Sequence, residues 1–378
     1  MPEALPRDLR IDALRGLSLL MISTNHAAYL SGNHLLRDYS LQTLTLTDCA
    51  NVFIFISGYV AGLVYGRVLD DGGFRDVFRK AARRARQLYV WHVLALAVTV
   101  AIVGAFRLGG VGALAQARLS PLFVRPLEAV PAALGLIYTP YAFDVLRLYI
   151  LLLLALPFWL WLLRRRPVVA LLVSAGLYAV PLLFPGAAIV DWPDGLQWYF
   201  NPLSWQLLFF LGTALARCGL PGPQRLWRSR GLLAACGCVV VVGVLVRTAA
   251  PAVMAAWDPR VPFIHDDLVW GKLPWTGKPN LEFTRLVYFG ALSLVVLRVL
   301  PRALGLWRSR LAAPVVACGR KALQTYCLGL CLVYLIAALT RIWGDGNVMI
   351  AGLTAAGWGI QMLAAVAMTR RGSRAAPG

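Results

Sequence analysis

Long apolar runs recur along the whole chain, and short charged segments separate them. A run of roughly 17–25 residues spans the ~30 Å hydrocarbon core of a bilayer as an α-helix. The pattern therefore predicts an all-α integral membrane protein, with residues 1–378 folded as a single bundle of about ten transmembrane helices. The predicted helices cover residues 11–30, 48–66, 87–106, 143–163, 167–185, 203–217, 231–250, 283–300, 322–340 and 348–368.

Composition supports this class, and the distribution of charge orients the bundle. Hydrophobic residues make up 59% of the chain and charged residues only 14%, yet the net charge is +20. Most Lys and Arg residues lie in alternate connections between the apolar runs, which is the positive-inside pattern. We therefore expect both termini in the cytoplasm, lipid as the surroundings and no nucleic acid as partner. The sequence sets no oligomeric state.

The first apolar run contains two ionisable side chains, Arg15 and His26. Eleven residues of α-helix return to within ~20° of the starting face and rise ~16 Å. Both side chains are thus predicted on one face, looking into the bundle. Ionisable groups in a hydrocarbon layer are costly and commonly functional. The alternatives are that Arg15 reaches the cytoplasmic headgroups and that His26 is only structural.

Two polar residues are candidates to act with the histidine. Asn25 adjoins His26, and Asp48 opens the second apolar run at a matching depth on the outer side. A carboxylate beside an imidazole fixes its tautomer and raises its basicity, as a general base requires. We therefore predict a catalytic group of His26, Asp48, Asn25 and Arg15, with a His26–Asp48 contact as a hypothesis.

A second set of polar residues leads into the third apolar run. Arg83 and Arg86 are three residues apart, as are Tyr89 and His92, so each pair shares a helix face. Guanidinium groups suit phosphate oxygens. These four residues are the candidate site for a phosphate-bearing acyl donor from the cytoplasm. The alternative is that the arginines serve only as a topology signal.

The predicted outer side is rich in aromatic residues mixed with carboxylates and amines, above all in residues 251–280. That mixture suits sugar rings, although interfacial anchoring also favours Trp and Tyr. Asn201, Trp205 and Arg285 are the candidate acceptor-binding residues, and a pair with Glu282 is the alternative for Arg285. No metal-ligand spacing and no nucleotide-binding loop is found, so we expect no metal and no bound cofactor.

These motifs together resemble a known family. Arg15-x10-His26 and Arg83-x-x-Arg86 resemble the membrane-bound acyltransferase-3 superfamily. The likeness to its OpgC members runs from residue 7 to about residue 335. The segments that carry it are RDLRIDALRGLSLLMISTNH, NVFIFISGYVAGLVYG, RARQLYVWH, FNPLSWQLLFFLG, GKPNLEFTRL and CGRKALQTYCLGL.

The resemblance implies a multi-pass enzyme of the bacterial inner membrane that places succinyl groups on osmoregulated periplasmic glucans, with succinyl-CoA as donor. It implies that His26 is the catalytic histidine and that Arg15, Arg83 and Arg86 support it. Asn25 stands where such proteins often carry an acidic residue, a charge that Asp48 is placed to supply. Three alternatives remain. The first is another acyl group, such as acetyl, or another envelope saccharide, and the second is an anion or glucan transporter, which repeated halves would favour. The third is a non-catalytic scaffold for glucan export.

Overall fold

The computed structural model describes residues 8–33, 35–106, 117–184, 189–220, 222, 224–257, 277–300 and 304–374. Within these ranges the protein is α-helical apart from turns and one isolated β-bridge between Val190 and Gln197. The prediction of an all-α protein is confirmed. The loop 258–276, with most of the polar residues expected on the outer side, lies outside the described residues.

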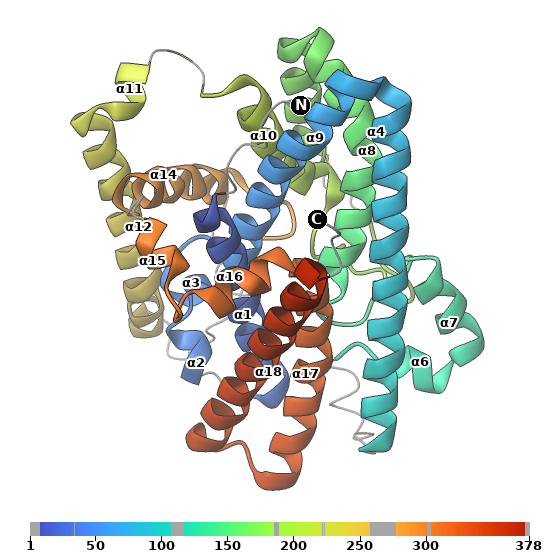
Figure 1. Cartoon of the computed structure of the whole chain (residues 1–378). Helices are drawn as coiled ribbons and strands as arrows, with labels where there is room; N and C mark the ends of the chain where they lie inside the picture. The colour runs from blue at the N-terminus through green and yellow to red at the C-terminus, as the bar shows by residue number, and fades with distance from the viewer. Residues whose placement is uncertain are drawn as a thin grey trace. The chain divides into compact units, whose positions relative to one another are not determined.

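A helix covers every segment that the apolar pattern predicts, and most ends agree within two or three residues (Figure 1). The helices are α1 (Leu9–Ser31), α2 (Leu35–Asp38), α3 (Leu41–Leu44), α4 (Cys49–Ala105), α6 (Ser120–Val124), α7 (Pro126–Leu134), α8 (Asp144–Arg165), α9 (Pro167–Leu183), α10 (Pro202–Cys218), α11 (Gln224–Arg228), α12 (Arg230–Trp257), α14 (Phe283–Val299), α15 (Leu304–Arg308), α16 (Ala313–Arg320), α17 (Ala322–Trp343) and α18 (Asn347–Arg374).

The main correction concerns α4, which takes in the predicted segments 48–66 and 87–106 and the charged stretch between them. The only non-helical backbone inside α4 is at Gly73, with φ 80° and ψ −172°. Glycine adopts positive φ readily because it lacks a Cβ. The second arm begins before its apolar segment because Arg, Lys and Ala, which are frequent in residues 75–86, are strong helix formers. The predicted helix end at 66 and start at 87 therefore fall inside helix, on either side of the break at Gly73.

Five helices in the described part of the chain are long and apolar enough to cross a membrane. They are α4, α8, α17, residues 230–249 of α12 and residues 347–371 of α18. Helices α10 and α14 have 17 residues each, at the lower end of the roughly 17–25 that span a bilayer. The protein thus has several candidate membrane helices. The count of ten spans and the cytoplasmic termini stay predictions.

The chain divides into two compact units. Unit one consists of residues 1–37, 91–113 and 301–378, and unit two of residues 38–90 and 114–300. The single domain predicted for the whole chain stays a prediction, and each unit is described by itself.

In unit one, α1 packs against α16 and α17, and α18 packs against the same two helices. Helix α1 begins after Asp8, whose carboxylate accepts a hydrogen bond from the Arg10 amide at 3.0 Å. The Arg10 side chain also donates to Asp8 and holds the pKa of that carboxyl below its usual range. A Cβ on Gly16 would overlap the Val315 carbonyl oxygen, and one on Gly319 would overlap that of Asp12. Two glycines thus allow the backbones of α1 and α16 to approach closely.

In unit two, α8, α9 and α10 pack together, and α12 packs against α14. The first arm of α4 crosses α10 at a second pair of glycines. A Cβ on Gly58 would overlap the Phe209 carbonyl oxygen, and one on Gly212 would overlap that of Phe55. Both units therefore bring helices together at reciprocal glycine contacts.

Ion pairs in unit two join helix ends that the topology predicts on one side. Asp70, near the end of the first arm of α4, pairs with Arg217 at the end of α10 (2.7 Å) and with Arg164 at the end of α8 (3.8 Å). Near the starts of α8 and α10, by contrast, Arg147 binds Asp191 and Asn201 binds Asn280. The helix ends that meet are those that the sequence predicts on the same side of the membrane. Which side faces the cytoplasm stays a prediction.

Candidate active site

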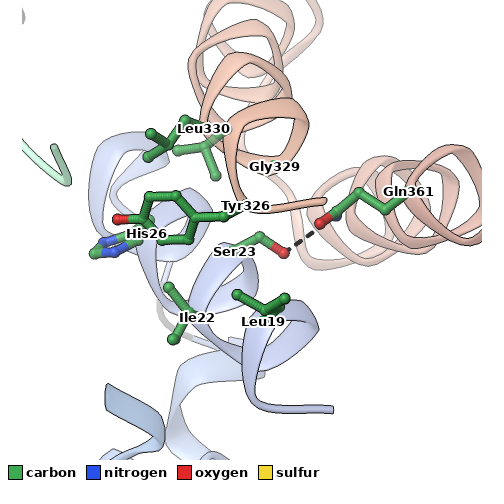
Figure 2. Close-up of a pocket in the computed structure, with 9 residues that line it drawn as sticks. Leu19, Ile22, Ser23, His26, Tyr326, Gly329, Leu330 and Gln361 are labelled. Atoms are coloured by element: carbon green, nitrogen blue, oxygen red, sulfur yellow. Dashed lines mark hydrogen bonds between the residues drawn. The ribbon is translucent and has the colours of Figure 1, made fainter. Parts of the chain in front are cut away.

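A pocket in unit one contains the predicted catalytic histidine. The empty space there is about 200 Å³ when open solvent at its mouth is counted, and the enclosed part is about the size of one water molecule. Figure 2 shows the side chains that line it, with His26 and Tyr326 at one side of the view and Gln361 at the other. The lining residues are Leu19, Ile22, Ser23 and His26 from α1, Tyr326, Gly329, Leu330 and Val333 from α17, and Gln361 from α18.

The helical period explains the α1 side of this pocket. Its α1 residues are spaced three, four and seven positions apart and so lie on one face of the helix. Helix α1 is continuous from Leu9 to Ser31, so Arg15 lies on the same face as His26, one turn before Leu19. Asn25 is buried about 100° around the helix from His26, outside the pocket lining. The face shared by Arg15 and His26 is the one that lines the pocket.

Polar contacts from α18 hold the middle of α1. Trp358 donates its indole N–H to the Leu20 carbonyl oxygen (3.1 Å) and to Thr24 Oγ1 (3.0 Å). Gln361 Nε2 donates to Ser23 Oγ at 3.3 Å. The sequence interpretation assigned no role to Trp358 or Gln361. The sequence held a signal for them: an indole and a side-chain amide three residues apart in an apolar helix share one face. Polar groups in such a helix need partners, so this face is expected to contact another helix.

An ion pair holds the first turn of α1. Asp12 is buried and forms an ion pair with Arg320 of α16, with 3.5 Å between Oδ2 and Nε. Together with the glycine contacts of α1 and α16, this pair fixes the segment that presents Arg15. The helix carrying His26 is therefore held by α16 and α18 through contacts within residues 12–24.

The predicted donor-binding residues all lie on the second arm of α4. Arg83 and Arg86 are exposed, and the helical backbone between them places them on one face, as predicted. The Tyr89 hydroxyl donates to the Leu134 carbonyl oxygen at 2.9 Å. His92 is fully buried and belongs to unit one, whereas the other three residues belong to unit two. The role of these residues in donor binding stays a prediction.

Asp48 has two functions within unit two. Its Oδ1 accepts hydrogen bonds from the amides of Ala50 (2.8 Å) and Asn51 (3.1 Å) and so caps α4. Its Oδ2 lies 2.7 Å from Lys278 Nζ, and both side chains are buried. The sequence interpretation included position 278 only within the polar stretch 251–280 and missed this pair. The hypothesis that Asp48 acts on His26 stays untested.

The predicted acceptor-binding residues belong to unit two, as Asp48 does. Asn201 and Trp205 are fully buried and tie α10 to the turn before α14. Asn201 Nδ2 donates to Asn280 Oδ1 (3.0 Å), and Trp205 Nε1 donates to the Pro279 carbonyl oxygen (3.1 Å). Arg285 is also buried, and its charge acts on Asp48. The described contacts of Asn201 and Trp205 are structural, and binding of an acceptor by all three residues stays a prediction.

A buried ionic cluster in unit two was not expected from the sequence. Arg147 pairs with Asp191 and with Asp144 (2.7 Å), and its guanidinium lies 3.5 Å from the Trp198 ring centre. Arg118 binds the same Asp191 at 3.1 Å. These contacts fasten the 189–198 loop to the start of α8. Among the described residues, no group of His, Cys, Asp or Glu side chains is arranged to hold a metal ion.

The family is identified by comparison with known proteins. The family model described as OpgC protein matches residues 7–374. The chain belongs to the OpgC family. The match takes in α18 and so extends well past residue 335, where the likeness of individual segments ends. No curated protein and no solved structure matches the chain. Membership implies succinylation of osmoregulated periplasmic glucans and suggests an acyltransferase.

Proposed function

We propose that the protein is an inner-membrane O-acyltransferase that moves a succinyl group from cytoplasmic succinyl-CoA to hydroxyl groups of periplasmic glucans. The observation that carries the proposal is His26 in a pocket, on the face of α1 that also bears Arg15, in a chain of the OpgC family.

His26 acts as general base in this scheme. The imidazole accepts the proton of the glucan hydroxyl while that oxygen attacks the thioester carbonyl carbon. The tetrahedral intermediate collapses, the carbon–sulfur bond breaks, and the proton passes from the imidazolium to the leaving thiolate. The products are a succinyl ester and free CoA, and His26 returns to its neutral form. A two-step route through an acyl-His26 intermediate has the same balance.

The other predicted site residues are assigned to the donor or to the acceptor. Arg83 and Arg86 bind the phosphates of the donor, because exposed guanidinium groups on one helix face match phosphate oxygens. Arg15, on the His26 face of α1, is assigned to the part of the donor between its phosphates and the reacting thioester. Asn201, Trp205 and Arg285 are assigned to the acceptor side, and Asp48 keeps its predicted catalytic role.

The test is release of free thiol by purified protein mixed with succinyl-CoA and glucan. Removing a general base slows a reaction by about 100- to 10,000-fold, so His26→Ala is expected to lose thiol release by that factor. Ser31→Ala, on the same helix beyond the pocket, serves as the control and is expected to keep its rate. Full activity of a folded His26→Ala protein contradicts the mechanism. Glucan or anion movement without thiol release by the wild type contradicts the proposed function itself.

A further inference from the structure

The wall of the His26 pocket contains one hydrogen-bond acceptor that the proposed mechanism does not use. Gln361 is 2% exposed, and its Oε1 has no hydrogen-bond partner among the described residues. A buried amide oxygen normally accepts at least one hydrogen bond, and leaving it unpaired is costly. The oxygen therefore calls for a ligand that carries a donor.

Neighbouring groups fix which end of the Gln361 amide is the oxygen. Nε2 donates to the Gly357 carbonyl oxygen at 3.3 Å, and a carbonyl only accepts. Nε2 also donates to Ser23 Oγ, whose own proton is directed to the Leu20 carbonyl oxygen at 2.8 Å. Reversing the amide would place two oxygens against each other at Gly357. Oε1 instead faces Gly329 of α17, where a built Cβ would lie 2.9 Å away.

The chemistry of Oε1 limits what it can bind. An amide oxygen repels a carboxylate, so it is not the site for the free carboxylate of a succinyl group. It accepts from an N–H or an O–H. Leu19, Ile22, Leu330 and Val333 give the rest of the wall an apolar lining suited to methylene groups.

The level of Gln361 Oε1 relative to the residues of α1 favours one hydrogen-bond donor. Its partner Ser23 precedes His26 by three residues, a rise of about 4.5 Å toward the end of the helix that bears Arg15. In an acyl-CoA, two methylene groups separate the sulfur from the first amide N–H of the arm. A thioester at His26, approached from the Arg15 side, brings that amide to the level of Ser23 and Gln361.

We propose that Gln361 Oε1 accepts a hydrogen bond from the amide N–H nearest the thioester and so positions the thioester at His26. The inference rests on the proposed function, because it assumes a pantetheine-type donor. Gln361 is thereby a binding residue of the acyl donor, supplied by the C-terminal helix α18. Its contact with Ser23 holds the oxygen in place.

The test compares two short donors that carry the same acyl group. One is S-succinyl-N-acetylcysteamine, which retains the amide; the other is its ester analogue, in which oxygen replaces N–H. The wild type is expected to favour the amide donor by about tenfold in kcat/KM, and Gln361→Met is expected to lose the preference. Gly329→Ala, which places a methyl beside Oε1 and leaves Gln361 intact, is expected to reduce it too.

Trp358→Phe is the matched control. It removes the other hydrogen bonds from α18 to α1 but lies outside the pocket lining, so the preference for the amide donor is expected to remain. An unchanged preference in both Gln361→Met and Gly329→Ala overturns the inference. So does a raised KM for glucan in Gln361→Met with the donor preference intact, which assigns Oε1 to the acceptor hydroxyl. A wild type that releases no thiol from succinyl-CoA overturns the proposed function, and the inference with it.

Discussion

At the scale of single residues, buried charges in unit two are paired across long stretches of sequence. Asp48 caps α4 and binds Lys278, whose ammonium also lies 4.7 Å from the Tyr199 ring centre. Removing one member of a buried pair leaves an uncompensated charge, which costs more than the pair contributes. Substituting such a residue lowers stability whether or not the residue takes part in catalysis. Stability and activity must therefore be measured on the same variant.

Lys278→Met gives a direct measure of this pair. Because Asp48 stays buried without its partner, we expect a loss of about 3–5 kcal/mol of stability, read as a lower thermal unfolding midpoint in detergent. The double variant Asp48→Asn, Lys278→Met should recover part of the loss, since it removes the buried carboxylate together with its ammonium partner. A single variant as stable as the wild type contradicts the buried pair.

At the scale of elements, close helix contacts place the catalytic face. Helix α1 meets α16 through Gly16 and Gly319, where any Cβ would overlap backbone. In a bilayer, association of helices depends on close packing because lipid chains are as apolar as the side chains. The position of the α1 face that carries His26 is therefore sensitive to a single methyl group far from the pocket.

Gly319→Ala is expected to destabilise the protein by about 1–3 kcal/mol, because the overlap with Asp12 is relieved only by moving one helix. The loss is measured as a lower unfolding temperature, with a fall in thiol release. The matched control is Gly352→Ala in α18, where an added Cβ meets no atom within 4 Å. Equal effects of the two substitutions contradict the close approach of α1 and α16.

At the scale of the whole molecule, the distribution of basic residues predicts which helix ends face the cytoplasm. Within unit two, Asp70, Arg164 and Arg217 meet at helix ends that are all predicted on that side. Within unit one, Asp12 meets Arg320 at helix ends with the same prediction. The proposed reaction needs this polarity, because donor and acceptor occupy different compartments.

Fusion of a fluorescent protein that matures only in the cytoplasm tests the orientation. A fusion at the C-terminus, after α18, is expected to fluoresce in bacteria, because the basic end of this helix is predicted inside. Alkaline phosphatase fused at the same place, which is active only in the periplasm, is expected to be inactive. The reverse result places the C-terminus outside and contradicts the predicted topology.

The sequence alone determined where the helices lie and which α1 residues share a face. Both follow from local physics: a bilayer requires long apolar segments, and a period of 3.6 residues aligns Arg15 with His26. The same local signals misplaced the ends within α4, since charged helix formers extend a helix past its apolar part.

Only the tertiary structure decided which distant residues meet. Gln361 joins the His26 pocket, and Lys278 pairs with Asp48, through contacts between segments far apart in the chain. Hydrophobic periodicity reports which side of a helix is buried, but it holds no information on which other helix buries it. Partners across helices depend on packing that the whole fold sets, and the structure alone supplies them.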